Sequence, residues 1–323
     1  MDASLRERRG ILVGAAAGRK VLVVAGPTAS GKSAAALAIA HERPATVINA
    51  DALQVYRDLA ILTARPSEAE SGAAPHRLYG VLDGADPCSA GRWRDMALAE
   101  IAAAHDSGRL PVLVGGTGMY LKALIEGIAP TPEVPDAIRA DVRARLARDG
   151  VAALHAELAA LDPAMAARLG PADAQRVSRA LEVRRATGRS LAAFQAQGTP
   201  PPGLAFMVLK LIPPAEIARP VIAARCAAMI EAGALGEVRA LLARGLDPAL
   251  PVMKAVGVPE LAAHLRGECD RQGALARFVV ATQRYAKRQR TFFRHQLPAA
   301  RQWDAQYSER IAGEIGSFIR LTC

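Results

Sequence analysis

A glycine-rich segment between an apolar run and a helix-forming run constrains the fold of this chain more than any other feature. The apolar run is KVLVVA at residues 20–25, and the helix-forming run AAALAIAHE begins after Ser33. Between them the chain reads G-x-x-x-x-G-K-S, the pattern of a phosphate-binding loop that joins a strand to a helix. The eight residues of this loop are Gly26, Pro27, Thr28, Ala29, Ser30, Gly31, Lys32 and Ser33.

The residue types of this loop predict a site for a diphosphate or triphosphate group. Glycines let backbone N–H groups turn inward, and the start of the helix adds the positive end of its dipole. Lys32 would supply a mobile charge for the terminal phosphate, and Ser33 would ligate the Mg²⁺ that accompanies it. The loop does not identify the phosphate compound, and ATP or GTP bound by a kinase or NTPase is the default.

The strand ends argue against that default. An NTPase usually has a second apolar strand ending in an acid that helps to hold magnesium. Here the candidate strand LPVLV at 110–114 ends in Gly115-Gly116-Thr117, and the acid, Asp51, follows the candidate strand ATVINA at 45–50. Strands alternating with helices predict a parallel α/β sheet, in which ligands gather at the carboxyl ends of the strands. We therefore expect these loops to converge on one site.

A change of composition near residue 129 predicts a second domain. Prolines 130, 132 and 135 precede several helical segments, and a TPPPG stretch at 199–203 precedes the next candidate strand, FMVLKLI at 206–212. The fold class is thus α/β, with a parallel-sheet core of the P-loop NTPase type and a mostly helical insertion domain. We place the core at 20–128 and 201–323, the insertion at 129–200 and a flexible extension at 1–19. After residue 212 we expect only helix.

Positive charge is concentrated near the C-terminus. The chain has a formal net charge of +10, and residues 271–303 contain no acid. On a helix, Phe278, Tyr285, Phe292 and Phe293 fall on one side, so they are expected to pack on the protein. A basic arc falls on the other side: Arg277, Arg284, Lys287, Arg288, Arg290 and Arg294. We interpret this arc as a phosphate-backbone contact surface, with a solvated basic face as the alternative.

Other features of the sequence are less specific. The cysteines Cys88, Cys226, Cys269 and Cys323 are widely spaced, which favours neither a zinc site nor a disulfide framework. No apolar run is long enough to span a bilayer. We therefore expect a soluble cytoplasmic protein without a membrane partner, acting as a monomer.

Six motifs follow one another in a fixed order between about Val21 and Arg294: GPTASGKS, INADALQVYRDLAILTARP, PHRL, VGGTGMYLKALIEG, QRVSRALEV and RYAKRQRTFFR. This succession resembles one known family, the tRNA dimethylallyltransferases or tRNA isopentenyltransferases. The resemblance implies that the loop holds the diphosphate of dimethylallyl diphosphate rather than ATP, and that Mg²⁺ is required. It implies transfer of the five-carbon group to the exocyclic N6 amine of the adenosine just 3′ of the anticodon of a tRNA.

The resemblance also implies roles for individual residues. Asp51 matches the family's general base, Thr117 a threonine near the reacting centre, and Arg225 an arginine that approaches the diphosphate beside Lys32. The residue types alone leave Asp51 open as a helix N-cap or magnesium acid, Thr117 as a turn residue and Arg225 as a surface residue. Segments that would contact the anticodon stem-loop are Asp51, Ala52, Leu53, Gln54, Thr117, Arg139, Gln175, Arg176, Val177, Ser178, Arg179, Lys287, Arg288, Arg290 and Arg294. Gln54 could pair with an adenine edge.

Four positions depart from the family pattern. Ala52 stands where serine is usual, Leu62 replaces a glycine, Val258 a tyrosine and Phe292 a tryptophan. Since Asp51 and Lys32 are intact, we expect activity to survive. Two alternatives remain at this point: a nucleotide or small-molecule kinase, and a non-enzymatic RNA-binding protein with a vestigial loop.

Overall fold

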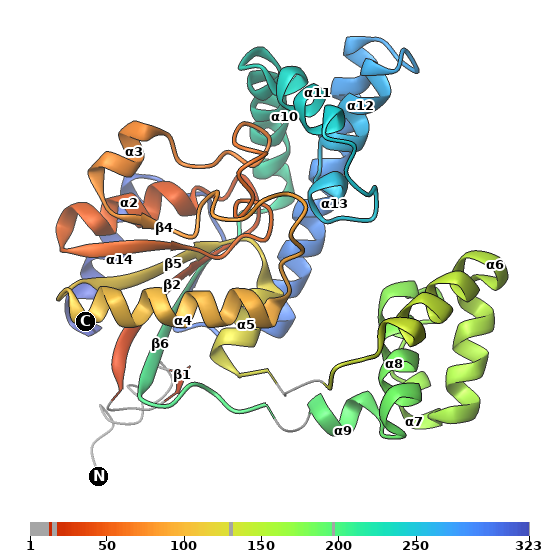
Figure 1. Ribbon diagram of the computed structural model, residues 1–323. Coiled ribbons are helices and arrows are strands. Elements are labelled where there is room, and N and C mark those ends of the chain that lie inside the picture. The colour runs from red at the N-terminus through yellow and green to blue at the C-terminus, as the bar shows by residue number, and fades with distance from the viewer. Residues whose placement is uncertain (1–12, 15–17, 129–131, 196–197, 323) are drawn as a thin grey trace. The chain divides into compact units, whose positions relative to one another are not determined.

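The computed structural model describes residues 13–14, 18–128, 132–195 and 198–322 (Figure 1). The chain divides into two compact units, and each is described by itself. The core unit consists of Met1–Ile125 and Pro201–Cys323, and the helical unit of Glu126–Pro200. The insertion therefore starts three residues before the position at which the prolines and the change of composition place it.

The core unit is built on one sheet, in which the described part of the chain supplies seven strands. Their order is β1-β6-β2-β5-β3-β4, with β7 also paired to β6. All neighbours are parallel except β1, which runs antiparallel to β6. The strands are β1 (Val13–Gly14), β2 (Arg19–Ala25), β3 (Ala45–Asn49), β4 (His76–Arg77), β5 (Leu110–Gly115), β6 (Leu204–Leu211) and β7 (Arg301–Trp303).

Because β2, β5 and β3 are parallel neighbours, their carboxyl ends meet at one edge of the sheet. Ala25 is in register with Gly115, and Asn49 with Val114, so the loops after these strands start side by side. This arrangement confirms the predicted parallel α/β core. It also brings the phosphate-binding loop and the segments that start at Ala50 and Gly116 together.

Buried side chains alternate between the two faces of the sheet, as the pleat requires. Val21 and Val23 belong to the hydrophobic core on one face, and Leu22 and Val24 to that on the other. The second face is covered by α2 (Lys32–Glu42) and α14 (Glu309–Thr322). The first face is covered by α4 (Ala90–Asp106), α5 (Gly118–Ile125) and α13 (Arg271–Gln296). The same core continues into α10 (Ala215–Glu231), α11 (Ala234–Ala243) and α12 (Val258–Leu265), which stand together in Figure 1.

Three short strands were not predicted. The expectation that the chain is helical after residue 212 is wrong, because β7 pairs in parallel with Leu209–Leu211 of β6. Within the predicted extension at 1–19, Val13 and Gly14 pair with Phe206 and Ala205, so this part belongs to the sheet, whereas 1–12 and 15–17 lie outside the described residues. β4, only two residues long, extends the sheet beside β3.

The phosphate-binding loop is closed by residues far along the chain. Helix α2 starts at Lys32, and its N-cap, Gly31, has φ of 81°, a left-handed conformation that favours glycine. A Cβ on Gly31 would lie 2.5 Å from the Cβ of Tyr307, and Tyr307 donates its N–H to Ser30 O at 3.0 Å. The segment before α14 therefore supports the loop from behind and requires glycine at position 31.

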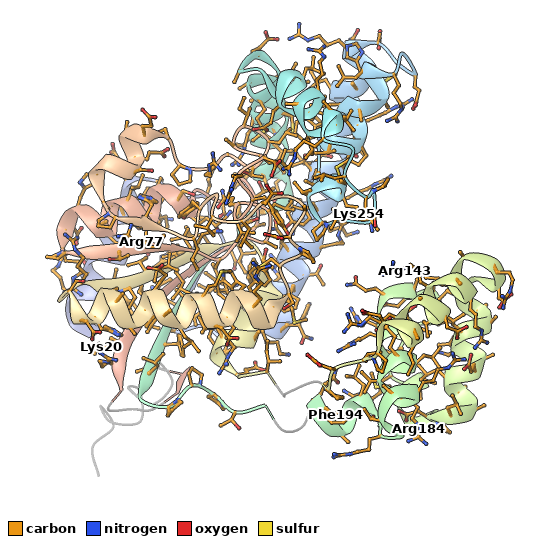
Figure 2. The ribbon with its side chains drawn as sticks, in the orientation of Figure 1. Lys20, Arg77, Arg143, Arg184, Phe194 and Lys254 are labelled. Atoms are coloured by element: carbon orange, nitrogen blue, oxygen red, sulfur yellow. The ribbon has the colours of Figure 1, made fainter. Side chains whose placement is uncertain are left out.

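The helical unit has its own small core. Val142 and Leu158 of α6 (Asp136–Leu161) pack with Val177 and Leu181 of α8 (Ala174–Thr187), while Arg143 lies exposed on the outside (Figure 2). Helix α6 is interrupted at Gly150, which has φ of 78° and ψ of 170°. The remaining helices of this unit, α7 (Pro163–Ala166) and α9 (Leu191–Gln195), are short.

Among the described helices, none combines the length and the apolar character that a membrane crossing requires.

Candidate active site

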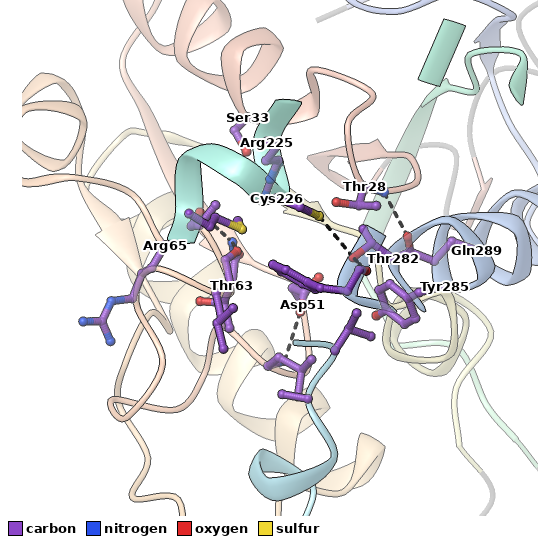
Figure 3. Close-up of a pocket in the computed structure, with 18 of the residues that line it drawn as sticks. Thr28, Ser33, Asp51, Thr63, Arg65, Arg225, Cys226, Thr282, Tyr285 and Gln289 are labelled. Carbon is purple, nitrogen blue, oxygen red and sulfur yellow. Dashed lines mark hydrogen bonds between the residues drawn. The ribbon is translucent and has the colours of Figure 1, made fainter. Parts of the chain in front are cut away.

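A pocket of about 300 Å³ lies where the carboxyl ends of the strands meet α10 and α13 (Figure 3). The phosphate-binding loop contributes Thr28, Lys32 and Ser33 to its lining, and α10 contributes Arg225. The segment after β3 contributes Asp51, Leu53, Gln54 and Leu62–Arg65, and α13 contributes Phe278, Thr282, Tyr285 and Gln289. The structure thus brings Asp51, Lys32, Ser33 and Arg225 to one pocket.

Asp51 is held in a tight turn at the end of β3. Asn49, fully buried, donates from Nδ2 to Asp51 O at 3.0 Å and accepts the Asp51 N–H on Oδ1 at 2.8 Å. Asp51 Oδ1 in turn accepts the N–H of Leu53 at 3.0 Å, an Asx turn. Its second oxygen, Oδ2, makes no hydrogen bond within the described part of the chain. One oxygen therefore orients the carboxylate, and the other is available in the pocket.

Thr117 contacts the backbone on either side of Asp51 and is not among the residues that line the pocket. Its Oγ1 accepts the N–H of Ala52 at 2.9 Å, and its own N–H reaches Ala50 O at 3.2 Å. Burial, together with the charge of Asp51, raises the pKa of Tyr285, and the neighbouring Thr117 and Gln289 side chains oppose this shift. Thr117 therefore ties the loop after β5 to the turn that carries Asp51.

Gln289 joins the two loops and is a residue that the sequence analysis missed. It is buried on α13, accepts the N–H of Thr28 on Oε1 at 2.9 Å and donates from Nε2 to Gly116 O at 2.9 Å (Figure 3). A Cβ on Gly116 would lie 2.2 Å from Nε2, so this approach requires glycine at that position. A single side chain thus fixes the phosphate-binding loop relative to the loop after β5.

A signal for Gln289 was present in the sequence. Tyr285, Gln289 and Phe293 are spaced by four residues, so all three lie on the face of the helix that was expected to pack inward. Phe278 and Phe293 are indeed buried, while Lys287, Arg288 and Arg294 are exposed on the opposite face. A buried glutamine needs hydrogen-bond partners for its amide. Its position in an otherwise aromatic stripe is therefore the signal that could have identified Gln289.

Two cations and one carboxylate share the pocket. Burial lowers the pKa of Lys32 to about 8; Asp51 opposes this shift and Arg225 adds to it. Burial likewise lowers the pKa of Arg225 from its ordinary value, against the attraction of Cys226 and Asp51. Lys32 also donates to Pro27 O at 3.4 Å. Two half-buried positive charges beside the glycine-rich loop favour an anionic ligand with more than one charge.

The donors in the pocket fit magnesium better than a softer metal. Thr28, Ser33 and Asp51 offer only oxygen atoms, and no group of three His, Cys, Asp or Glu side chains that could hold a metal occurs among the described residues. Magnesium prefers oxygen ligands and is commonly held by one carboxylate or hydroxyl together with substrate phosphates. The residues therefore fit a Mg²⁺ that arrives with a phosphorylated ligand.

The candidate RNA-contacting residues fall into three groups. Lys287, Arg288 and Arg294 are exposed on the outward arc of α13, whereas Arg290 is half-buried, and Arg294 makes a loose ion pair with Asp304 at 3.9 Å. In the pocket, Gln54 donates from Nε2 to Thr63 O at 2.9 Å and Ala64 O at 3.1 Å, which leaves its Oε1 as the atom for a ligand. In the helical unit, Arg139, Gln175 and Arg176 are exposed, Ser178 and Arg179 half-buried, and Val177 fully buried, so its side chain serves the core of that unit.

The sheet order, the loop after β2 and the pocket define the class: an α/β protein of the P-loop type with a helical insertion. The model of the family described as IPP transferase matches residues 54–296. The tRNA dimethylallyltransferase of Rhodospirillum centenum is 57% identical over 288 residues, covering 88% of this chain and 92% of that protein. That of Rhodospirillum rubrum is 57% identical over 279 residues, covering 86% of each. The chain therefore belongs to the IPP transferase family.

Solved structures agree with this assignment. The full-length tRNA isopentenylpyrophosphate transferase of Bacillus halodurans is 30% identical with a TM-score of 0.68, covering 94% of this chain and 96% of that one. A eukaryotic dimethylallyltransferase acting on tRNA is 26% identical with a TM-score of 0.78, covering 94% of this chain and 80% of that one.

Replacing Gln289 by leucine is expected to weaken both folding and diphosphate binding. The change leaves the buried Gly116 O and the part-buried Thr28 N–H without their partner, which costs about 2 kcal/mol of unfolding free energy. Denaturant unfolding and titration with inorganic diphosphate measure the two effects, with Gln272→Ala, an exposed position on the same helix, as the control. A variant that matches wild type in both measurements would show that the bridge has no such role.

Binding of a diphosphate is expected to weaken as the pH rises through about 8. Since burial lowers the pKa of Lys32 to about 8, the free protein carries this charge below that pH and loses it above. Calorimetric titration with dimethylallyl diphosphate between pH 7 and 10 should show a dissociation constant that rises above pH 8, by up to about tenfold per unit. Lys32→Met should bind more weakly at pH 7 and lose this dependence; a flat wild-type profile would contradict the assignment.

Proposed function

We propose that the protein transfers a dimethylallyl group from dimethylallyl diphosphate to the exocyclic N6 amine of the adenosine just 3′ of the anticodon of tRNA. The observation that carries the proposal is the single pocket that holds the Asp51 carboxylate together with Lys32, Ser33 and Arg225. It offers a proton acceptor on one side and an anion site on the other. Membership of the IPP transferase family, and relatives named as tRNA dimethylallyltransferases, support this activity rather than the kinase or the non-enzymatic alternative.

The pocket suits both parts of the prenyl donor. Its diphosphate would lie on the loop of residues 26–33, where the start of α2 and the side chains of Lys32 and Arg225 are positive. The five-carbon group needs an apolar surface, and the same pocket is lined by Cys226, Met229, Val256 and Phe278. Magnesium, when bound at Ser33 with the diphosphate, would neutralise part of its charge.

The reaction is a substitution at the allylic carbon. A bond forms between the adenine N6 and that carbon, the bond from the carbon to the diphosphate oxygen breaks, and the electron pair leaves with the diphosphate. The N6 lone pair is delocalised into the ring, so a base must take the N6 proton as the new bond forms. Asp51 Oδ2 is proposed as that base. Lys32, Arg225 and the loop amides stabilise the charge that develops on the leaving oxygens.

We propose that the tRNA is held by the outward face of α13 and by residues of the helical unit. The exposed basic side chains of α13 suit the phosphate backbone, and the target base must leave its stack to enter the pocket. There, Gln54 Oε1 can accept a hydrogen bond from the exocyclic amine of adenine, since its Nε2 is occupied by Thr63 O and Ala64 O. Arg139, Gln175, Arg176, Ser178 and Arg179 are the proposed contacts of the helical unit.

Unmodified tRNA incubated with labelled dimethylallyl diphosphate and Mg²⁺ is expected to become labelled by the wild-type protein. Asp51→Asn keeps the size of the side chain and removes its basicity, so the rate should fall by about 10²–10⁴ while tRNA still binds. Absence of label with the wild-type protein would refute the proposed activity. Equal labelling by Asp51→Asn would leave the activity and remove Asp51 as its base.

Arg288→Ala is expected to weaken tRNA binding and to reduce its salt dependence. Removing one interaction between an arginine and a phosphate should lower the slope of log K against log salt concentration by about 0.7–1. Binding measured between 50 and 200 mM salt tests this, with Arg239→Ala, an exposed arginine on α11, as the matched control. An unchanged slope for Arg288→Ala would show that this face does not meet phosphate.

A further inference from the structure

One wall of the pocket is a hydrogen-bonded turn whose first N–H groups find no acceptor within the turn itself. Leu62, Thr63 and Ala64 line the pocket from this turn, which is closed by the N–H of Ala64 to Ile61 O at 3.0 Å and the N–H of Arg65 to Ala60 O at 2.9 Å. As at the start of a helix, the first N–H groups of such a turn have no acceptor within it. Here those groups belong to Ala60, Ile61 and Leu62.

A carboxylate on another helix accepts all three of these N–H groups. Glu237 of α11 accepts the N–H of Ala60 at 2.5 Å and of Ile61 at 2.9 Å on Oε1, and that of Leu62 at 2.9 Å on Oε2. Its side chain is half-buried, so solvent screens these bonds only in part. Successive amides aimed at one anion form a concave anion site, and hydrogen bonds to an ionised acceptor are the strong ones.

A residue at the end of helix α11 contacts the segment before and after this turn at a second point. Arg244, just after the end of α11, forms ion pairs with Asp58 and with Asp83, the latter at 2.6 Å, and Asp58 Oδ2 accepts the N–H of Gly84 at 2.8 Å. Val238 and Leu241 of α11 belong to the same hydrophobic core as Leu59 and Leu62. The turn is therefore held by the hydrogen bonds of Glu237, by the ion pairs of Arg244 and by the apolar contacts between them.

The held turn determines which atom Gln54 presents to the pocket. Thr63 O and Ala64 O, the next two carbonyls of the turn, accept both hydrogen bonds from Gln54 Nε2. If the turn rotates, Gln54 loses these acceptors and its amide is free to flip. Ala64 has φ of 46°, a conformation that a loose turn would not keep without support.

We propose that Glu237 is a positioning residue: by holding the amides of residues 60–62 it sets the orientation of Gln54 for the target adenine, without touching either substrate. The inference rests on the proposed function. The phosphate-binding loop is held independently of α11, by Gln289 on Thr28 and by Tyr307 on Ser30. The loss of Glu237 should therefore affect the nucleoside side of the pocket and spare the diphosphate side.

The test compares wild type with Glu237→Ala, Glu237→Gln and the control Glu231→Ala, which removes an exposed carboxylate paired with Arg271 on the neighbouring helix. In Glu237→Ala we expect kcat/KM for tRNA to fall by about tenfold to a hundredfold, with KM for dimethylallyl diphosphate unchanged within about twofold. Amide hydrogen exchange at residues 60–62 should accelerate while the rest of the core unit keeps its protection. Glu237→Gln, which retains one carbonyl oxygen, should show a smaller fall in kcat/KM for tRNA and a smaller acceleration of exchange at residues 60–62.

A double-mutant cycle with Gln54→Ala separates positioning from stability. If Glu237 acts through Gln54, the effect of Glu237→Ala on kcat/KM for tRNA should largely disappear in the Gln54→Ala background. Unchanged exchange at residues 60–62, an unchanged kcat/KM, a full effect in the Gln54→Ala background, or a loss of protection throughout the core unit would each overturn the inference. Absence of activity in the wild-type protein would instead refute the proposed function, and the exchange result would remain interpretable.

Discussion

Two hydrogen bonds of one buried side-chain amide fix the loops of this pocket relative to one another. Gln289 joins the Thr28 N–H of the phosphate-binding loop to the Gly116 carbonyl of the loop after β5. Thr117 then joins that second loop to the turn that carries Asp51. The anion site and the carboxylate come from different strands of the sheet, so their relative position depends on this chain of short contacts. A buried amide satisfied on both sides is costly to move, which makes the arrangement preorganised.

The pocket combines charges that would be unfavourable without a ligand. Lys32 and Arg225 are half-buried, and burial lowers the pKa of both. Asp51 compensates part of this charge, and its carboxylate is held by a single backbone N–H rather than by an ion pair of close geometry. A diphosphate with magnesium would balance the cations and leave Asp51 available to accept a proton. The electrostatics of the pocket therefore favour a ligand that brings its own negative charge.

The helices beyond the sheet act as supports as well as coverings. Helix α13 contributes its basic outer face to the proposed RNA surface, and its inner face supplies Gln289 and Tyr285 to the pocket. Helix α11 does not line the pocket, yet Glu237 and Arg244 hold the segment that forms one of its walls. The loops proposed to contact both substrates are thus held in place by side chains of α11 and α13. A precise site built on loops requires such support.

The sequence by itself determined the parallel core, the glycine-rich loop between β2 and α2, the helical insertion and the two faces of α13, because each depends on a local pattern or periodicity. The ordered family motifs also indicated Asp51 and Lys32 as site residues, and a separate match to a family arginine indicated Arg225. Only the tertiary structure decided the rest. β1, β4 and β7 span two or three residues, too short for any period, and form because a partner strand offers hydrogen bonds. Gln289 and Glu237 bond to backbone groups more than 170 residues away, a relation that no local pattern encodes.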